Sequence, residues 1–247
     1  IGLEKSIEKM EQSGLAIPQW VKQMQENGFT SFYKEMEGQT LYYEEDEYKA
    51  VKENKKVIHL SSLRSQNNVI LENSGASLID LGDDVACLQF TSPNNAIGLD
   101  IISLLNQSLE EVNKNYKGLV IGNQGKNFCV GANLAMILME AQDDNYFEVE
   151  LVIKQFQQAM MKVKYNEKPV VAAPFAMTLG GGAEICLPSA KIQASAETYM
   201  GLVEVGVGLI PGGGGNKELY IKQLNGLPNG VTLDLQQIAN KTFSCLI

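Results

Sequence analysis

The pattern of apolar and polar positions changes at Ala76, and the two sides of that point predict different kinds of structure. Over about residues 3–22, apolar positions recur only imperfectly at helical spacing. Residues 27–60 are polar and charged, and residues 61–74 form a polar stretch without a regular pattern. We therefore predict a small, mainly helical segment with a linker over residues 1–75, with too little apolar material for a core of its own.

Residues 76–247 alternate short apolar runs with amphipathic stretches. The expected order is strand, strand, helix, strand, helix, helix, strand, helix, strand and a helix-like end. This alternation is typical of an α/β domain with parallel strands and functional sites at their carboxyl ends. The expected strands include 77–81, 85–90, 118–121 and the apolar run 170–177, and the expected helices include 94–116, one opening at 131–134, 146–164 and a short one after 180–182.

The helix expected over residues 146–164 carries an apolar stripe of large side chains. We interpret this stripe as part of the hydrophobic core rather than as a cofactor site. Its members are Phe147, Leu151, Phe156, Met160 and Val163.

Charge excludes some classes of partner. The net charge is −9 and the pI is near 4.8, so no basic face is available for nucleic acid. A polyanionic ligand must instead be received by local lysines or by backbone N–H groups. We expect the acidic run over residues 44–47 to be a solvated face.

Four cysteines are scattered along the chain without a CxxC pair, and His59 is the only histidine. We expect Cys87, Cys129, Cys186 and Cys245 to be free thiols in a reducing compartment, and no metal site. A single histidine excludes most Ser/His/Asp and Cys/His catalytic schemes. There is no apolar run of about 18 residues and no signal peptide, so we expect a cytoplasmic protein.

Candidate chemistry gathers where glycines join a strand to a helix, at Gly131 and at residues 180–182. Such turns leave backbone N–H groups free, and two turns from different strands can aim two donors at one oxygen that becomes negative during reaction. Glu184 falls in the first helical turn after the second set of glycines, and Glu204 stands in an apolar window, 200–210. Glycine turns and a first-turn glutamate also serve purely structural roles, and the pattern alone leaves both readings open.

Four motifs in a fixed order carry a resemblance to a known family. They are Pro93-Asn94-Asn95-Ala96-Ile97, then Phe128 to Leu134, then Gly180-Gly181-Gly182-Ala183-Glu184, and finally Glu204 through Gly208-Leu209-Ile210-Pro211 to Gly214. With these motifs, residues 76 to about 225 resemble the crotonase superfamily of enoyl-CoA hydratases and isomerases.

The resemblance implies a spiral of strand-strand-helix units, with trailing helices that often pack between subunits of a homo-oligomer. By position, the N–H groups of Ala132 and Gly181 would form an oxyanion hole for the thioester of an acyl-CoA, and Asn133, Leu134 and Ala135 would line the pantetheine end. Coenzyme A would be part of the substrate, and no separate cofactor is expected. We expect Lys126 to contact its phosphates.

The same resemblance implies that Glu184 activates the water and that Glu204 delivers the α-proton. Two carboxylates favour hydration of 2-enoyl-CoA in fatty-acid β-oxidation, because isomerases of this type usually work with one. Two alternatives stay open, a Δ3,Δ2-enoyl-CoA isomerase and a non-catalytic module that binds acyl-CoA.

Some positions depart from the family pattern. Asn133 stands where Asp is common, Leu202-Val203 stands where many hydratases have a proline before the glutamate, and Pro188 is expected to shorten the helix that carries Glu184. The chain ends soon after Pro211, so we expect the trailing helices to be incomplete.

Ile17-Pro18-Gln19-Trp20-Val21 and the tyrosine-rich segment after it resemble the tail of a 3-hydroxyacyl-CoA dehydrogenase, as in bacterial proteins that join this enzyme to a hydratase, and this resemblance gives residues 1–75 a meaning. It implies that NAD would bind to the catalytic part of the dehydrogenase, which we do not expect in this chain. Residues 206–211 match only half of a GxGxxG motif and lack its last glycine, so we expect no NAD site there. A thiolase is an expected partner of such a system.

Overall fold

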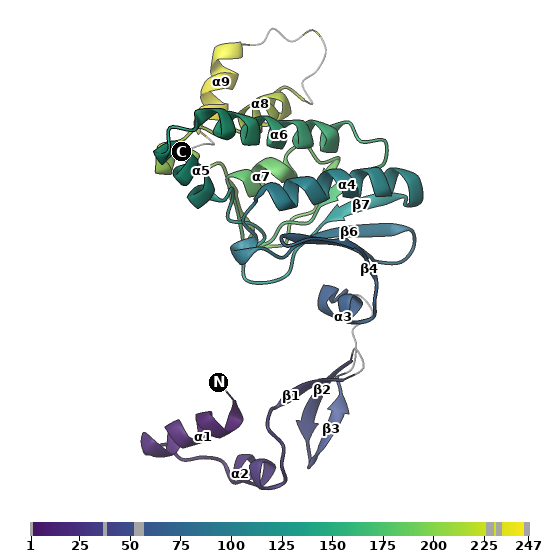
Figure 1. Ribbon diagram of the computed structural model, residues 1–247, viewed down its shortest axis with the longest axis vertical. Helices are drawn as coiled ribbons and strands as arrows, with labels where there is room; N and C mark the ends of the chain where they lie inside the picture. The colour runs from purple at the N-terminus through teal and green to yellow at the C-terminus, as the bar shows by residue number, and fades with distance from the viewer. Residues whose placement is uncertain (1, 37–38, 52–56, 226–229, 231–233, 245–247) are drawn as a thin grey trace. The chain divides into compact units, whose positions relative to one another are not determined.

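The computed structural model describes residues 2–36, 39–51, 57–225, 230 and 234–244 (Figure 1). The chain divides into two compact units, residues 1–67 and 68–247.

The first unit combines two amphipathic helices with a three-stranded antiparallel sheet in the order β1-β2-β3. One apolar face of each amphipathic helix contributes to a small buried cluster, formed by Leu3, Ile7, Val21 and Met24. The elements of this unit are α1 (Leu3–Gln12), α2 (Gln19–Glu26), β1 (Tyr33–Met36), β2 (Gln39–Glu44), β3 (Glu47–Ala50) and α3 (Leu60–Ser65).

The sequence pattern underestimated this unit in two ways. The expectation that it has no core of its own is wrong, because the helices bury apolar side chains against each other. The sheet over residues 33–50 was not predicted either. Its middle strand buries none of its side chains fully, so the alternation of apolar and polar residues is weak. The acidic run 44–47 is exposed, as predicted, and it spans the turn between β2 and β3.

The second unit is built on a six-stranded sheet in the order β10-β8-β7-β6-β5-β4. The strands β4, β5 and β6 pair antiparallel, and β6, β7, β8 and β10 pair parallel. Their bounds are β4 (Val69–Glu72), β5 (Ala76–Asp80), β6 (Val85–Phe90), β7 (Gly118–Ile121), β8 (Val170–Ala172) and β10 (Lys191–Ile192).

The edge strand β4 lies in residues 61–74, which were expected to have little structure. That expectation is wrong, because β4 pairs with β5 and α3 precedes it. Since β4 belongs to the large sheet, the chain divides between residues 67 and 68 rather than between 75 and 76.

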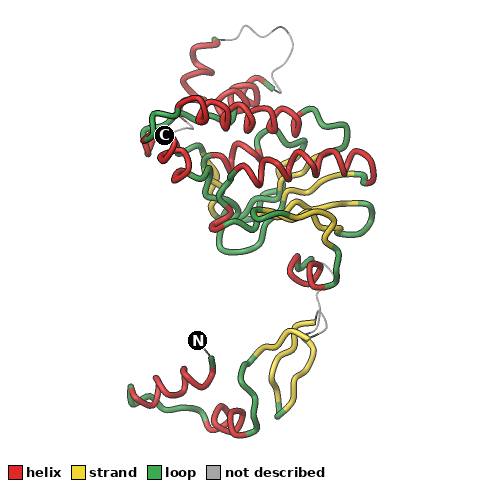
Figure 2. The backbone as a smooth tube through the Cα atoms, in the orientation of Figure 1, coloured by secondary structure: helices red, strands yellow, loops and turns green. Residues whose placement is uncertain are grey.

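The long helices lie on one side of this sheet (Figure 2). α4 (Leu99–Asn115) packs against the central strands, and α6 (Tyr146–Lys164) packs against α4. The buried faces of these two helices and the apolar residues of β5, β6, β7 and β8 form the main hydrophobic core. The remaining elements are η1 (Pro93–Asn95), α5 (Leu134–Gln142), α7 (Gly181–Cys186), η2 (Glu204–Val207), α8 (Gly215–Leu224) and α9 (Leu235–Ser244).

The apolar run 170–177 was predicted as one strand, but it contributes to two sheets. It forms β8 and then, after a corner at Pro174 and Ala176, begins β9 (Met177–Leu179), which pairs parallel with β11 (Tyr199–Gly201). Ala176 has a positive φ of 46°, and Pro174 lacks an N–H group for the ladder. The chain therefore leaves the large sheet here, and β9 leads to the glycine turn at residues 180–182.

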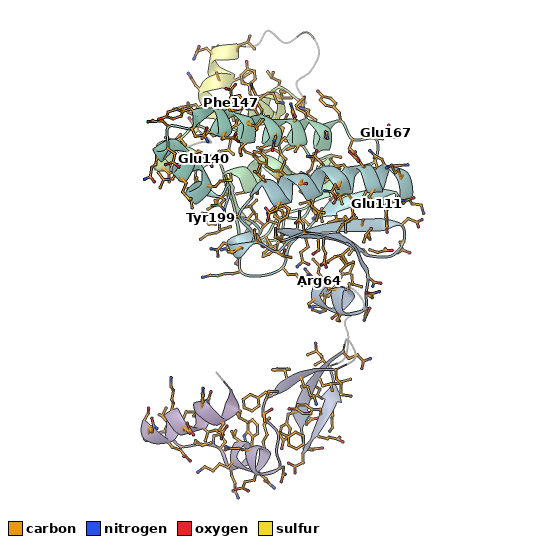
Figure 3. All side chains as sticks on the ribbon, viewed as in Figure 1. Arg64, Glu111, Glu140, Phe147, Glu167 and Tyr199 are labelled. Carbon is orange, nitrogen blue, oxygen red and sulfur yellow. The ribbon has the colours of Figure 1, made fainter. Side chains whose placement is uncertain are left out.

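The apolar stripe of α6 was predicted to be core throughout. This holds for Phe156, Met160 and Val163, but it is wrong for Phe147 and Leu151, which are exposed (Figure 3). All the buried residues of α6 lie in its carboxyl-terminal half, from Phe156 onward.

Candidate active site

A cavity of about 340 Å³ opens beside the amino-terminal end of α7. Its walls come from the turn before α5, the middle of α6, the start of α7 and the segment from Val203 to Gly213. Among the described residues that line it, Glu184 and Glu204 are the only charged ones, and the others are apolar side chains and glycines. The cavity therefore suits an apolar ligand that presents a reactive group to two carboxyl groups.

The two glycine turns meet on one wall of this cavity. A methyl group on Gly181 would lie 3.3 Å from the nitrogen of Ala132, so the two backbones pass very close to each other. Parallel bridges join Ile97 to Ala132 and Cys129 to Thr178, and these fix the first turn against its neighbours. Within the described residues, neither the Ala132 N–H nor the Gly181 N–H has a hydrogen-bond acceptor. The geometry thus leaves two adjacent donors free on the cavity wall.

The turns need glycine at their bends. Gly131 has φ of 110° and Gly180 has φ of 52°, both in the region that side-chain-bearing residues rarely adopt. A methyl group on Gly131 would also lie 3.1 Å from the carbonyl oxygen of Leu179. The strain that any other residue would introduce explains why glycines stand where the two donors are aimed.

Cys129 packs between the two turns. Its sulfur accepts a hydrogen bond from the Gly131 N–H at 3.4 Å, and a methyl group on Gly182 would lie 2.9 Å from the same sulfur. Burial raises the pKa of the Cys129 thiol to about 12, so the group is a neutral packing element. Cys87 and Cys186 are likewise free and buried, and Cys245 lies outside the described residues.

Glu184 is buried, with 3% of its surface exposed, and its carboxylate is held by backbone groups. Its Oε1 accepts hydrogen bonds from the N–H groups of Gly213 at 2.8 Å and Gly215 at 2.9 Å. Burial raises the pKa of Glu184 above its ordinary value and the charge of Glu204 adds to this, whereas the N–H groups of residues 213–215 act to lower it. Gly215 also opens α8, whose dipole favours a negative charge at that end.

Glu204 begins η2 and is half-buried. A methyl group on Gly180 would lie 3.1 Å from its Oε1, so the carboxyl group stands over the turn that leads to the Gly181 N–H. Its Oε2 is buried and has no hydrogen-bond partner among the described residues. Burial raises the pKa of Glu204 above its ordinary value, so the environment favours the protonated acid.

The structure brings together five of the residues named from the sequence: Ala132, Leu134, Gly181, Glu184 and Glu204 all line the cavity. The other three lie outside that lining. Asn133 is exposed and caps α5, accepting from the Met136 N–H at 3.4 Å, while Ala135 and Lys126 are exposed. Their proposed contacts with the pantetheine and phosphate groups remain predictions.

Sequence reasoning missed the contribution of α6. A methyl group added to Gly213 would collide with the ring of Phe156. A methyl group added to Gly181 would lie 3.6 Å from the same ring. Val149, Val152 and Ile153 of the same helix complete that wall. Phe156 was identified as core, and nothing in helical periodicity distinguishes a side chain that faces the core from one that also faces a cavity.

Asn123 was also missed. Its side chain accepts from the Phe90 N–H at 2.7 Å and donates to the Phe128 carbonyl at 2.6 Å, which ties the end of β6 to the first glycine turn. Its place just after an apolar strand and its amide group are the signals that could have identified it.

The resemblance to the crotonase superfamily predicted an α/β unit with parallel strands, and comparisons with known proteins support this fold. A crystal structure of an enoyl-CoA hydratase from Polaromonas sp. JS666 is similar in fold, with a TM-score of 0.58 and 21% identity over 69% of this chain and 62% of that one. DspI of Pseudomonas aeruginosa is 28% identical with a TM-score of 0.53, over 62% of this chain and 58% of that one.

The family described as enoyl-CoA hydratase/isomerase matches residues 81–226, and the chain belongs to that family. A probable 3-hydroxyacyl-CoA dehydrogenase of Bacillus subtilis (strain 168) is 66% identical over 224 residues, which are 91% of this chain and 28% of that protein. A putative fatty acid oxidation complex trifunctional enzyme of Rickettsia felis is 34% identical over 181 residues, 73% of this chain and 25% of that protein. The chain thus spans about a quarter of the length of these curated relatives. None of its described helices combines the length and the apolarity that a membrane span requires.

Proposed function

We propose that this chain carries the site for hydration of 2-enoyl-CoA thioesters to 3-hydroxyacyl-CoA. The observation that supports this most is the pair of free N–H groups of Ala132 and Gly181, side by side on a cavity whose charged lining residues are Glu184 and Glu204. Hydration of a conjugated thioester needs these parts: donors for the oxygen, a base for water and an acid for the α-carbon.

The reaction divides between these groups as follows. Glu184 removes a proton from water, and the hydroxyl oxygen bonds to the β-carbon. The electron pair of the double bond moves toward the thioester oxygen, which accepts hydrogen bonds from the two N–H groups, each supplying about 3 kcal/mol of transition-state stabilisation. The α-carbon then takes the proton of Glu204. Atoms balance, since one water is added and the two carboxyl groups exchange their protonation states.

The surroundings suit the two carboxyl groups to opposite tasks. Burial raises the pKa of Glu184, and the two backbone hydrogen bonds that its Oε1 accepts act against burial, toward the ionised form that a base requires. Glu204 has a buried oxygen without a partner, and burial raises its pKa, which favours the protonated form that an acid requires.

The relatives support a wider setting for this step. Their names mention 3-hydroxyacyl-CoA dehydrogenase and a fatty acid oxidation complex, so we place this hydratase in fatty-acid β-oxidation, in a cytoplasmic protein that also carries a dehydrogenase. In that arrangement the first unit, residues 1–67, is the tail of the dehydrogenase part, NAD binds outside this chain, and coenzyme A enters only as part of the substrate. Homo-oligomerisation and a thiolase partner belong to the same proposal.

Hydration of crotonyl-CoA, followed as loss of the absorbance of the conjugated thioester, tests the function. We expect Glu184→Gln and Glu204→Gln each to lower kcat by about 10³-fold, because each removes a proton-transfer group. The matched control is Glu167→Gln, an exposed glutamate beyond the end of α6 (Figure 3), and it should hydrate at the rate of the unaltered chain.

Other outcomes would contradict the proposal. Hydration that survives both substitutions would exclude the two-carboxylate mechanism. Binding of crotonyl-CoA without turnover in the unaltered chain would favour a non-catalytic module, and conversion of a 3-enoyl-CoA that survives Glu184→Gln would favour an isomerase.

A further inference from the structure

One peptide group connects α6 to the carboxylate of Glu184. The carbonyl oxygen of Gly212 accepts a hydrogen bond from the Gln157 side-chain amide at 2.7 Å, and the N–H of the same peptide, that of Gly213, donates to Glu184 Oε1 at 2.8 Å. Since C=O and N–H point in opposite directions across a trans peptide, Gln157 and Glu184 hold its two ends. Hydrogen bonds linked in series polarise one another, so the first strengthens the second.

A second attachment lies about two helical turns farther along the same face of α6. Lys164 Nζ donates to both carboxylate oxygens of Glu218, at 2.9 and 2.8 Å. Glu218 is buried in the first turn of α8, which opens at Gly215, the second backbone donor to Glu184. Burial acts to raise the pKa of Glu218, but the hydrogen bonds from Lys164 and Lys217 outweigh it and lower that pKa, so the pair is ionised.

Both donors to Glu184 therefore stand on a short segment, residues 212–218, that α6 holds at each end. We infer that Gln157 and Lys164 are positioning residues for Glu184. They hold this segment so that two N–H groups face one carboxylate oxygen, and in this way they keep the base ionised and correctly aimed. This inference deepens the proposed function and rests on the role given there to Glu184.

Loosening the segment has a definite electrostatic consequence. Glu184 would keep its buried place but lose donors that act to lower its pKa, so the pKa would rise. The charged group that shares the cavity with Glu184 is Glu204. The charged groups beside the supporting segment, residues 212–218, are Lys164, Lys217 and Glu218. None of the substitutions below changes Glu204.

The first test compares neighbouring residues of one type on α6. Gln157→Met removes the hydrogen bond to Gly212 while keeping the length of the side chain. Gln158→Met alters the next residue, which is exposed and has no hydrogen bond among the described residues. In the pH dependence of kcat/KM, we expect Gln157→Met to shift the acid limb to higher pH by at least about half a pH unit. The same variant should lower kcat about tenfold. Gln158→Met should change neither.

The second test separates positioning from a direct effect of charge. Glu218→Leu removes a negative charge, and by direct interaction this would lower the pKa of Glu184. Positioning demands the opposite, because α8 loses its attachment and Gly215 moves. We expect the acid limb to shift upward in Glu218→Leu, and less in Glu218→Gln, which keeps an acceptor for Lys164. A surface ion pair of α6, Lys154 with Glu150, supplies the control Lys154→Met, which should leave the limb in place.

A readout that does not need turnover is the titration of the Glu184 carboxyl carbon in chain labelled with ¹³C-glutamate, assigned with Glu184→Gln. The carbon should titrate at higher pH in Gln157→Met and Glu218→Leu than in the unaltered chain. A downward shift, or no shift in a Gln157→Met variant with an unchanged circular dichroism spectrum, would overturn the inference. If the chain fails to hydrate crotonyl-CoA but the carbon titration shifts as expected, the proposed reaction is wrong and the positioning stands.

Discussion

The surroundings of Glu184 and Glu204 differ although both carboxyl groups line the same cavity. Glu184 is buried and is held by N–H groups of a segment about thirty residues away along the chain, at Gly213 and Gly215. Glu204 is half-buried and leaves one buried oxygen without a partner among the described residues. Burial raises the pKa of both carboxyl groups, but the backbone donors that act to lower the pKa of Glu184 come from a distant segment that does not reach Glu204, so the difference lies in the backbone groups around them rather than in the residues themselves.

Among changes that leave both glutamates in place, the largest expected effect comes from disturbing the donors on the Glu184 side. In Gly213→Ala the new methyl group would collide with the ring of Phe156 and lie 2.6 Å from Glu184 Oε2. The carboxylate must move, so we expect kcat/KM for hydration to fall about 100-fold. Gly206→Ala, beside Glu204, adds a methyl group where no atom lies within 4 Å, and it should reduce kcat/KM by less than about twofold.

Adding Phe156→Leu to Gly213→Ala makes room for the methyl group on one side. The double variant should recover part of the lost activity. Equal values of kcat/KM for Gly213→Ala and Gly206→Ala would show that the surrounding backbone does not cause the difference between Glu184 and Glu204.

A smaller effect is expected in the pH profile. A base that must be ionised and an acid that must be protonated give a bell-shaped dependence of kcat/KM on pH. The acid limb reports Glu184, whose pKa burial raises above the ordinary value. In Glu204→Gln the residual activity should lose the alkaline limb, and its acid limb should stay in place, because Glu204 is already protonated and neutral at the pH where Glu184 titrates.

Measurement of kcat/KM from pH 4 to 10 in both chains checks this, with Glu167→Gln as the variant in which neither limb should move. An acid limb that moves to lower pH in Glu204→Gln would mean that Glu204 is ionised where Glu184 titrates, contrary to its role as the acid.

The smallest effect concerns stability. Glu204 has a raised pKa in the folded chain, so the folded state binds more protons than the unfolded state between the two pKa values. The contribution of Glu204 to the free energy of unfolding is therefore fully present below its pKa in the unfolded chain. It is lost as the pH rises through its pKa in the folded chain. The neutral Glu204→Gln avoids that loss. We expect this variant to exceed the unaltered chain in free energy of unfolding at pH 7 by about 1 kcal/mol, the scale of one buried polar group left unpaired.

Urea unfolding at pH 4 and pH 7 tests this, and the difference between the chains should shrink at pH 4. Circular dichroism is the suitable signal, because the single tryptophan, Trp20, lies in the first unit, away from the residues of the site in sequence. Lower stability of Glu204→Gln at pH 7 would indicate that the charged form is favourably solvated.

Local patterns were sufficient for much of the second unit. Residues 77–81 and 85–90 are short, mainly apolar runs joined by the Gly82-Asp83-Asp84 turn, and the structure places β5 and β6 there. The α6 bounds, 146–164, follow from helical periodicity. The glutamate of α7 was found because glycines and a first-turn carboxylate mark a helix start, and α7 ends at Cys186, two residues before Pro188, which cannot continue the helix.

The remainder depends on contacts between distant residues. The split of the run 170–177 into two strands comes from a corner at Ala176, whose positive φ no composition signals. The bond from Gln157 to Gly212 joins residues 55 apart, and Gln157 is an ordinary polar residue of an amphipathic helix. The strands of the first unit were missed because none of β2 is fully buried, so the pattern that marks strands is weak there.

The packing of Cys129 against Gly182 has a consequence for how this family varies over evolution. A methyl group on Gly182 would lie 2.7 Å from the Cβ of Cys129 and 2.9 Å from its carbonyl oxygen. The carbonyl oxygen is present whatever residue stands at 129, so a smaller side chain there would not make room at 182. An alignment of relatives should therefore show glycine kept at 182 even where residue 129 changes.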